Sequence, residues 1–238
     1  MKRFYKDVSI SAADGGYLVE LDGRVVKTPG KETLLIPTKA LADAVAAEWQ
    51  EQSEEINPDS MPLTKLANTA LDRVLPRFDA VAAEIANFAG TDLLCYRTDE
   101  PADLVEHQNE IWNPYLIWAE EAFGVKLDVT DGIMPITQPA GSLEAIGGAV
   151  FAHDAFELTA LHEFTNGFGS VILGLAYMRE FAPFEDLWLA SILDQQHQEE
   201  TWGEDYEALE KKEKLLADLN AACEFLSHVR NKTSGQPG

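Results

Sequence analysis

The sequence predicts an α+β protein, in which a small β-rich N-terminal domain is followed by a larger multihelical bundle domain. Two observations support this prediction. Short segments rich in β-branched and aromatic residues, separated by glycine-containing turns, lie before residue 38. Beyond that point, apolar residues recur every three or four positions, which is the period of an α-helix, and one loop-like stretch at 125–139 interrupts them.

The β-rich start contains four predicted strands. The dipeptide Asp22-Gly23 lies between two of them and is a strong signal for a two-residue hairpin turn, because both of its positions need a positive φ. The strands are therefore expected to form a small antiparallel sheet or a partial barrel. The four segments are 3–10, 16–21, 24–28 and 33–37.

The first helices are expected to cover this sheet, since a small sheet must bury its apolar face. Thr38 can cap a helix whose apolar residues fall four positions apart. A second helical pattern begins at Leu63, is interrupted at Pro76 and resumes at Val81. The N-terminal domain is therefore predicted to span 1–90, with Pro58 as an alternative boundary.

Residues 91–230 are predicted to form the helical domain. Its first helix is predicted to run from Pro101 to Gly124. Proline is favoured in the first turn of a helix, and glycine is favoured just past the last turn. Its apolar stripe is predicted at Leu104, Ile111, Tyr115, Trp118 and Ala122, and Trp112 is also expected in the core. Further helices are predicted at 142–152, 154–166, 170–180, 184–200 and 204–229. The polar end, 231–238, is expected to be disordered.

Composition narrows the classes of function. The net charge of −23, from 18 basic and 41 acidic residues, disfavours nucleic acid as a partner and favours a basic or mixed protein surface. Simple solubility explains the charge equally well. No apolar run approaches a membrane span, and the N-terminus lacks the features of a signal or transit peptide, so a cytoplasmic protein without membrane insertion is expected. Cys95 and Cys223 are expected to be free thiols.

The sequence offers little for catalysis. His162 and Glu163 resemble the start of a zinc-protease helix motif, but Asn166 occupies the position of the second histidine. No phosphate-binding loop or nucleophile elbow is present. We therefore expect no enzyme, no metal and no cofactor. The alternative that remains open is a small-molecule hydrolase or ligand-binding domain with a cleft between the sheet and the helices.

Trp202 and Gly203 lie in an unusually charged stretch. The preceding helix is apolar up to about Asp194 and then becomes polar, so it is expected to run out of the core towards water. Gly203 can end that helix in a left-handed turn, and Glu204 and Asp205 suit the first turn of the next one. Trp202 then either folds back as a lid on the core or serves as an aromatic anchor for a partner, within an acidic rim. Both alternatives stay open at this point.

Seven segments, in order and spacing, resemble a known family across nearly the whole chain. They are "RFYK", "LDGRVVKTPGK", "LIPTKALADAVAAEWQEQ", "INPDSMPLTKLANTALDRV", "TDLLCYRT", "LVEHQNEIWNPYLIW" and "WLASILDQQHQEETWGED". Each is weak alone, but together they are specific. The family is that of the assembly chaperones for the alpha subunit of the F-type ATP synthase catalytic head.

The resemblance implies a non-enzymatic protein that holds the unassembled alpha subunit until the beta subunit replaces it. It also implies a fold like the one predicted above. We further expect a monomer. Mitochondrial relatives carry a transit peptide, so the start of this chain is typical of a bacterial member. The partner-binding residues implied are Arg97, Asp194, Gln198, Trp202, Gly203, Glu204 and Asp205. For Arg97, the ordinary alternative is a surface ion pair.

This chain departs from the family pattern at one point. The residues just before the glutamine of the "Q…WG" signature are usually acidic, whereas here Gln195 and Gln196 precede His197 and Gln198. Asp194 is the remaining carboxylate there. If the family needs a negative charge at this point, Asp194 must supply it.

Overall fold

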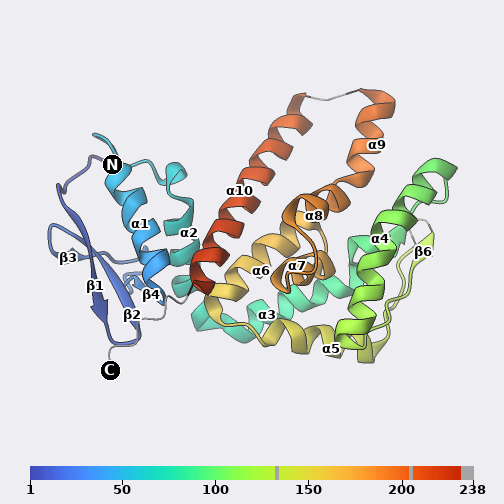
Figure 1. Cartoon of the computed structure of the whole chain (residues 1–238), viewed down its shortest axis with the longest axis horizontal. Helices are drawn as coiled ribbons and strands as arrows, with labels where there is room; N and C mark the ends of the chain where they lie inside the picture. The colour runs from blue at the N-terminus through green and yellow to red at the C-terminus, as the bar shows by residue number, and fades with distance from the viewer. Residues whose placement is uncertain (132–133, 204–205, 232–238) are drawn as a thin grey trace. The chain divides into compact units, whose positions relative to one another are not determined.

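The computed structural model describes residues 1–131, 134–203 and 206–231 (Figure 1). Its internal contacts divide the chain into two compact units. The first contains Met1–Phe78, Ala155–Ala160 and the chain from Asp218 onward, and the second contains Asp79–Asp154 and Leu161–Ala217. The domain boundary predicted near residue 90, or at Pro58, stays a prediction. Apart from Asn231, the predicted disordered tail lies outside the described residues.

A small antiparallel sheet opens the first unit, as predicted. Strand β1 (Val8–Ala13) pairs with β2 (Gly16–Leu21), and β2 pairs in turn with β3 (Arg24–Val25) and β4 (Leu35–Ile36). The turn between β2 and β3 has φ values of 51° at Asp22 and 74° at Gly23, which confirms the predicted hairpin. The segment around Arg3 is not a strand, and β1 starts later and runs further than predicted.

Helix α1 (Lys39–Glu51) packs on this sheet, against β1 and β2, as Figure 1 shows. Thr38 is its N-cap: the Leu41 amide donates to the Thr38 hydroxyl over 3.2 Å. Val19, Leu41 and Val45 are fully buried. The predicted burial of the sheet by the first helices is therefore confirmed, and it supplies the core of the first unit.

After α1, the chain continues through a run of short helical segments that ends in the second unit. A 3₁₀ turn at Pro58–Ser60 precedes α2 (Pro62–Thr69), and a π-helical turn at Ala70–Val74 follows α2 directly. The predicted interruption at Pro76 is a 3₁₀ turn, Leu75–Arg77, and α3 (Phe78–Asn87) begins immediately after it.

Glu48 links α1 to α2 within the first unit. Its carboxylate accepts hydrogen bonds from the Leu63 and Thr64 amides, both 2.7 Å, and from the Thr64 hydroxyl, 2.6 Å. The residue before α2, Met61, provides no side-chain cap. Glu48 therefore caps α2 from a neighbouring helix, and its burial raises the pKa of its carboxyl group.

The second unit is helical, so the predicted α+β class with a larger helical part is confirmed. Its short strands β5 (Tyr96–Arg97) and β6 (Thr130–Asp131) pair in parallel. The predicted single helix over 184–200 is two helices that meet at Ile192. The helices that lie in or extend from this unit are α4 (Ala102–Phe123), α5 (Ala140–Phe151), α6 (Ala155–Phe168), α7 (Val171–Met178), α8 (Phe184–Ser191), α9 (Leu193–Trp202) and α10 (Tyr206–Arg230).

Helix α7 lies in the centre of the second unit, and every one of its residues except Tyr177 is buried. Asp92, which is fully buried, holds its N-terminus: the Ile172 amide donates to one carboxylate oxygen over 3.2 Å and the Leu94 amide to the other over 3.1 Å. Burial raises the pKa of Asp92 to about 6, although the Ser170 hydroxyl and nearby amides oppose the shift.

The buried face of α4 differs from the predicted stripe. Ile111, Trp118 and Ala122 are not buried. Neighbouring positions on the helix are buried instead, and one of them is the polar Gln108. Because Gln108 is not apolar, the pattern of apolar residues did not indicate the correct face. The residues buried on α4 are Leu104, Gln108, Trp112, Tyr115 and Ala119.

Candidate partner-binding site

Trp202 is 85% exposed, so the alternative in which it covers the core is wrong. It is the last residue of α9, and every residue of this helix after Leu193 is exposed or half-buried. Gly203 follows with φ 88° and ψ 163°, a backbone conformation that essentially only glycine adopts. The predicted end of the helix at Gly203 is confirmed, but its predicted left-handed turn is wrong, because ψ lies far from the left-handed helical value.

Two further apolar side chains are exposed where the next helix begins. Tyr206, the first residue of α10, is 71% exposed, and Leu209 is also exposed. In Figure 1, the C-terminal end of α9 and the N-terminal end of α10 both lie at the top of the picture. We call Trp202, Tyr206 and Leu209 the tip surface.

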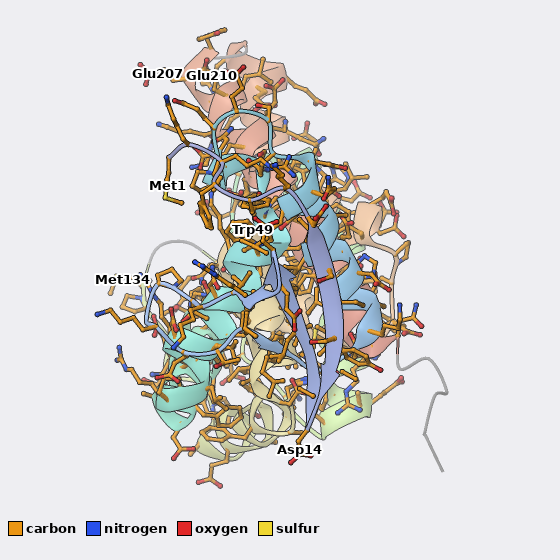
Figure 2. The ribbon with its side chains drawn as sticks, turned by 90° about the vertical axis from the view of Figure 1, so that its left-hand side faces the viewer. Met1, Asp14, Trp49, Met134, Glu207 and Glu210 are labelled. Carbon is orange, nitrogen blue, oxygen red and sulfur yellow. The ribbon has the colours of Figure 1, made fainter. Side chains whose placement is uncertain are left out.

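The tip surface lies among carboxylates. Glu200, Glu207 and Glu210 are exposed, and Figure 2 shows the side chains of Glu207 and Glu210 at the start of α10. Gln198, one of the predicted contacts, is also exposed on α9. The predicted combination of an exposed tryptophan and an acidic surrounding therefore exists within the described residues. Glu204 and Asp205 lie outside the described residues.

An ion pair ties α9 to α10 just behind the tip surface. The Lys212 ammonium group donates to Glu199 over 2.8 Å, and both side chains are about one-fifth exposed. The Gln195 amide donates to the other carboxylate oxygen of Glu199, also over 2.8 Å. The hydrogen bond from Lys212, together with that from Gln195, lowers the pKa of Glu199. This pair holds the two helix ends that carry the tip surface.

Arg97 is buried, so the alternative of a surface ion pair is wrong. Its guanidinium group donates to the Leu94 carbonyl over 2.8 Å, to the Gln108 carbonyl over 3.2 Å and to the side-chain oxygens of Asn109 and Asn113 over 3.0 and 3.1 Å. It also lies 5.1 Å from the centre of the Trp112 ring. Arg97 thereby joins β5 to α4.

Gln108 connects this arginine cluster to the start of α9. Its side-chain amide donates to Asp194 over 2.7 Å and accepts from the Thr98 amide over 2.9 Å. Nearby, the Trp112 indole donates to the Ala190 carbonyl over 2.8 Å. Burial lowers the pKa of Arg97, and the charges of Asp131 and Asp194 are among those that oppose the shift. Arg97 and Asp194, nearly a hundred positions apart, thus belong to one hydrogen-bonded network.

The sequence-predicted residues therefore fall into two groups. Gln198, Trp202 and Gly203 lie at or near the tip surface, whereas Arg97 and Asp194 lie at the base of α9. Gln108 and Trp112, which join the base together, were missed as site residues. The one signal for Gln108 was its position four residues after Leu104 and four before Trp112, which places it on the buried face of the helix.

The first unit has a groove between the sheet and the turn that follows α2, with a volume of about 750 Å³. Leu18 and Leu35 line it on the sheet side, and Leu71 and Leu75 on the helical side. Its lining contains three carboxylates and the Thr33 hydroxyl, but no histidine, cysteine or serine. Across the described part of the chain, no three His, Cys, Asp or Glu residues are placed to hold a metal ion.

Comparison with known proteins identifies relatives that match nearly all of the chain. A family model described as "ATP12 chaperone protein" matches residues 2–120. The protein atp12, mitochondrial, from Schizosaccharomyces pombe is 26% identical over 240 residues, which cover 95% of this chain and 82% of the relative.

Solved structures match the fold closely. The crystal structure of Atp12 from Paracoccus denitrificans superposes with a TM-score of 0.93 at 41% identity, over 96% of this chain and 98% of that one. A point mutant of the Paracoccus protein gives the same values. The Agrobacterium tumefaciens protein Atu1473 gives a TM-score of 0.91 at 38% identity, over 96% of this chain and 86% of that one.

Proposed function

The chain belongs to the ATP12 chaperone family, the non-enzymatic assembly chaperones of the ATP synthase alpha subunit, and from this premise we propose that its tip surface binds that subunit before assembly. The bound chaperone covers apolar surface on the alpha subunit that the beta subunit later covers. An unassembled subunit with such a patch exposed is prone to aggregate. The alternative of a hydrolase is set aside because the family is non-enzymatic.

The exposure of Trp202 is the observation that carries this proposal. An indole held 85% in water at the end of a polar helix contributes little to folding, and tryptophan is favoured at the centres of protein interfaces. Tyr206 and Leu209 add apolar area beside it, and the exposed carboxylates around them suit a partner surface with basic residues. Gln198 and Gly203 are proposed as contacts at the same surface.

Arg97 and Asp194 are proposed to act on binding by positioning α9. Asp194 accepts the hydrogen bond of Gln108, and Arg97 fixes the turn of α4 that carries Gln108. Because α9 ends at Trp202, a shift at its base is carried to the tip surface. The roles of Glu204 and Asp205 as partner contacts remain a proposal from the family resemblance alone.

The setting of this function is proposed to be the bacterial cytoplasm, with the chaperone acting as a monomer. Two solved relatives come from the bacteria Paracoccus denitrificans and Agrobacterium tumefaciens. No helix in the described part of the chain is long and apolar enough to cross a lipid bilayer.

The proposal is tested with purified alpha subunit at a concentration where it aggregates. Equimolar chaperone should suppress the rise in light scattering, and gel filtration should show a one-to-one complex. The assembled catalytic head is the control, since its alpha subunits are already covered, and it should not bind. Unchanged scattering with both proteins folded, or equal binding to the assembled head, would contradict the proposal.

A further inference from the structure

The groove of the first unit, which we call the sheet groove, is a second candidate surface for a polypeptide. Its walls are the side chains of Leu18 and Leu35 on the sheet side and of Leu71 and Leu75 on the helical side. Leu75 lines the groove and is nonetheless 57% exposed. A volume of about 750 Å³ accommodates several side chains of a bound segment.

The wall of the sheet groove is held in place before anything binds. Asp72 accepts a hydrogen bond from the Thr28 hydroxyl over 2.5 Å and from the Gly30 amide over 2.8 Å. A Cβ atom at Gly30 would lie 2.5 Å from a carboxylate oxygen of Asp72, so a larger residue there would have to displace this carboxylate. Asp72 itself belongs to the π-helical turn Ala70–Val74, a deviation from α-helix that is frequent at functional sites.

The charge of the lining indicates what the groove accepts. Asp14, at the end of the β1–β2 hairpin (Figure 2), Glu32 and Asp72 contribute carboxylates, and no lysine, arginine or histidine lines the groove. An apolar wall with carboxylates alone complements an apolar segment that also carries a basic side chain.

We propose that the sheet groove binds an apolar segment of the unassembled alpha subunit that carries a lysine or arginine. This inference rests on the proposed function and adds to the tip surface a second point of attachment, in the other compact unit of the chain. Two attachment points raise the overall affinity, since the second contact forms within one complex. Each point alone can then be weak, which suits a chaperone that must later release its subunit.

Leu75→Arg tests the groove, because Leu75 is exposed enough to be replaced without opening the core. The arginine fills the groove and repels a basic segment. We expect the affinity for the alpha subunit to fall at least about tenfold. Ile117→Arg on α4 is the matched control, since Ile117 is 56% exposed and lies in the second unit, and its affinity should stay within about twofold of the wild type. Glu32→Gln should weaken binding, and more so at low salt.

A photoreactive amino acid at position 75 of the full chain identifies the occupant even if Leu75→Arg fails to fold. The expected product joins position 75 to one alpha-subunit segment that contains apolar residues and a lysine or arginine. If the wild type binds the alpha subunit while Leu75→Arg binds equally well and no such product forms, the groove proposal is wrong and the proposed function stands. Cross-links between two copies of this chain, or to a segment without a basic residue, also overturn it. If the wild type does not bind the alpha subunit, both proposals fail.

Discussion

The indole of Trp202 should matter for binding and not for folding. Because it is 85% exposed, Trp202→Ala removes almost no buried area and should leave the urea midpoint nearly unchanged. If the indole is a central anchor, the substitution should weaken binding of the alpha subunit by about 2 kcal/mol or more, roughly thirtyfold. Urea titration and a binding isotherm measure the two effects separately.

Phe4→Ala is the control for Trp202→Ala, since Phe4 is an exposed aromatic residue, at 65%, in the other unit. It should change neither the affinity nor, by more than a few tenths of a kcal/mol, the stability. A Trp202→Ala protein that binds as tightly as the wild type would remove the tip surface from the interface.

Asp92 should make stability depend on pH. Its pKa is about 6 in the folded protein against 3.8 as its ordinary value, so the folded state retains at pH 5 a proton that the unfolded chain has released. This contribution to the free energy of unfolding is fully present below about pH 4 and is lost as pH rises through 6. Between pH 5 and pH 7.5, the loss should be about 1.4 kcal/mol.

Asp92→Asn isolates this contribution, because asparagine does not titrate. The difference in free energy of unfolding between wild type and variant should shrink by about 1.4 kcal/mol from pH 5 to pH 7.5, as measured by urea unfolding. The variant should be less stable throughout, since one carboxylate oxygen that accepts an amide hydrogen bond is lost. A difference that stays constant over this range would show that Asp92 is ionised throughout.

Helix α2 should depend for its stability on a carboxylate from α1. Glu48→Ala leaves the Leu63 and Thr64 amides and the Thr64 hydroxyl without their acceptor in a buried place. We expect the free energy of unfolding to fall by about 2–3 kcal/mol, and hydrogen exchange at the two amides to accelerate. Asp43→Ala is the control on the same helix, since the ion pair of Asp43 with Lys39 is exposed and worth little. Unchanged exchange in Glu48→Ala would show that water caps α2 equally well.

Elements whose cause is local could be predicted from the sequence, and those held by distant partners could not. The Asp22-Gly23 hairpin, the Thr38 cap and the helix end at Gly203 each depend on neighbouring residues, and each is observed. The cap from Glu48 depends on a partner fifteen positions away and has no local signal. The break at Ile192 was also missed, because a continuous apolar pattern runs through it.

The candidate site shows the same division. The exposure of Trp202 next to Gly203 could be predicted as one of two alternatives, because the residues around it in the sequence are polar. The burial of Arg97 could not be predicted, because the side chains on α4 that accept its hydrogen bonds come close to it only in the folded chain. Gln108, which joins Arg97 to Asp194, reads as an ordinary polar residue until its hydrogen bond to residue 194 is seen.

The net charge of −23 should accelerate association with the alpha subunit. If the charge steers the encounter, the association rate constant should fall about tenfold or more as NaCl rises from about 20 mM to 500 mM, whereas the dissociation rate constant should change little. Stopped-flow tryptophan fluorescence can follow both. If the association rate constant does not change with salt concentration, the charge serves solubility and does not steer the encounter.

The effect of the position of the charged residues can be measured separately from the effect of the net charge. Glu200→Lys with Glu210→Lys reverses two exposed carboxylates beside the tip surface, and Glu120→Lys with Glu121→Lys reverses two exposed carboxylates on α4. Both double variants change the net charge by +4, from −23 to −19. If the tip surface meets basic residues of the alpha subunit, the first variant should associate several-fold more slowly than the second at low salt, and the gap should close at high salt. Equal rates would mean that the field of the whole molecule steers the encounter and that the carboxylates at the tip have no special part in it.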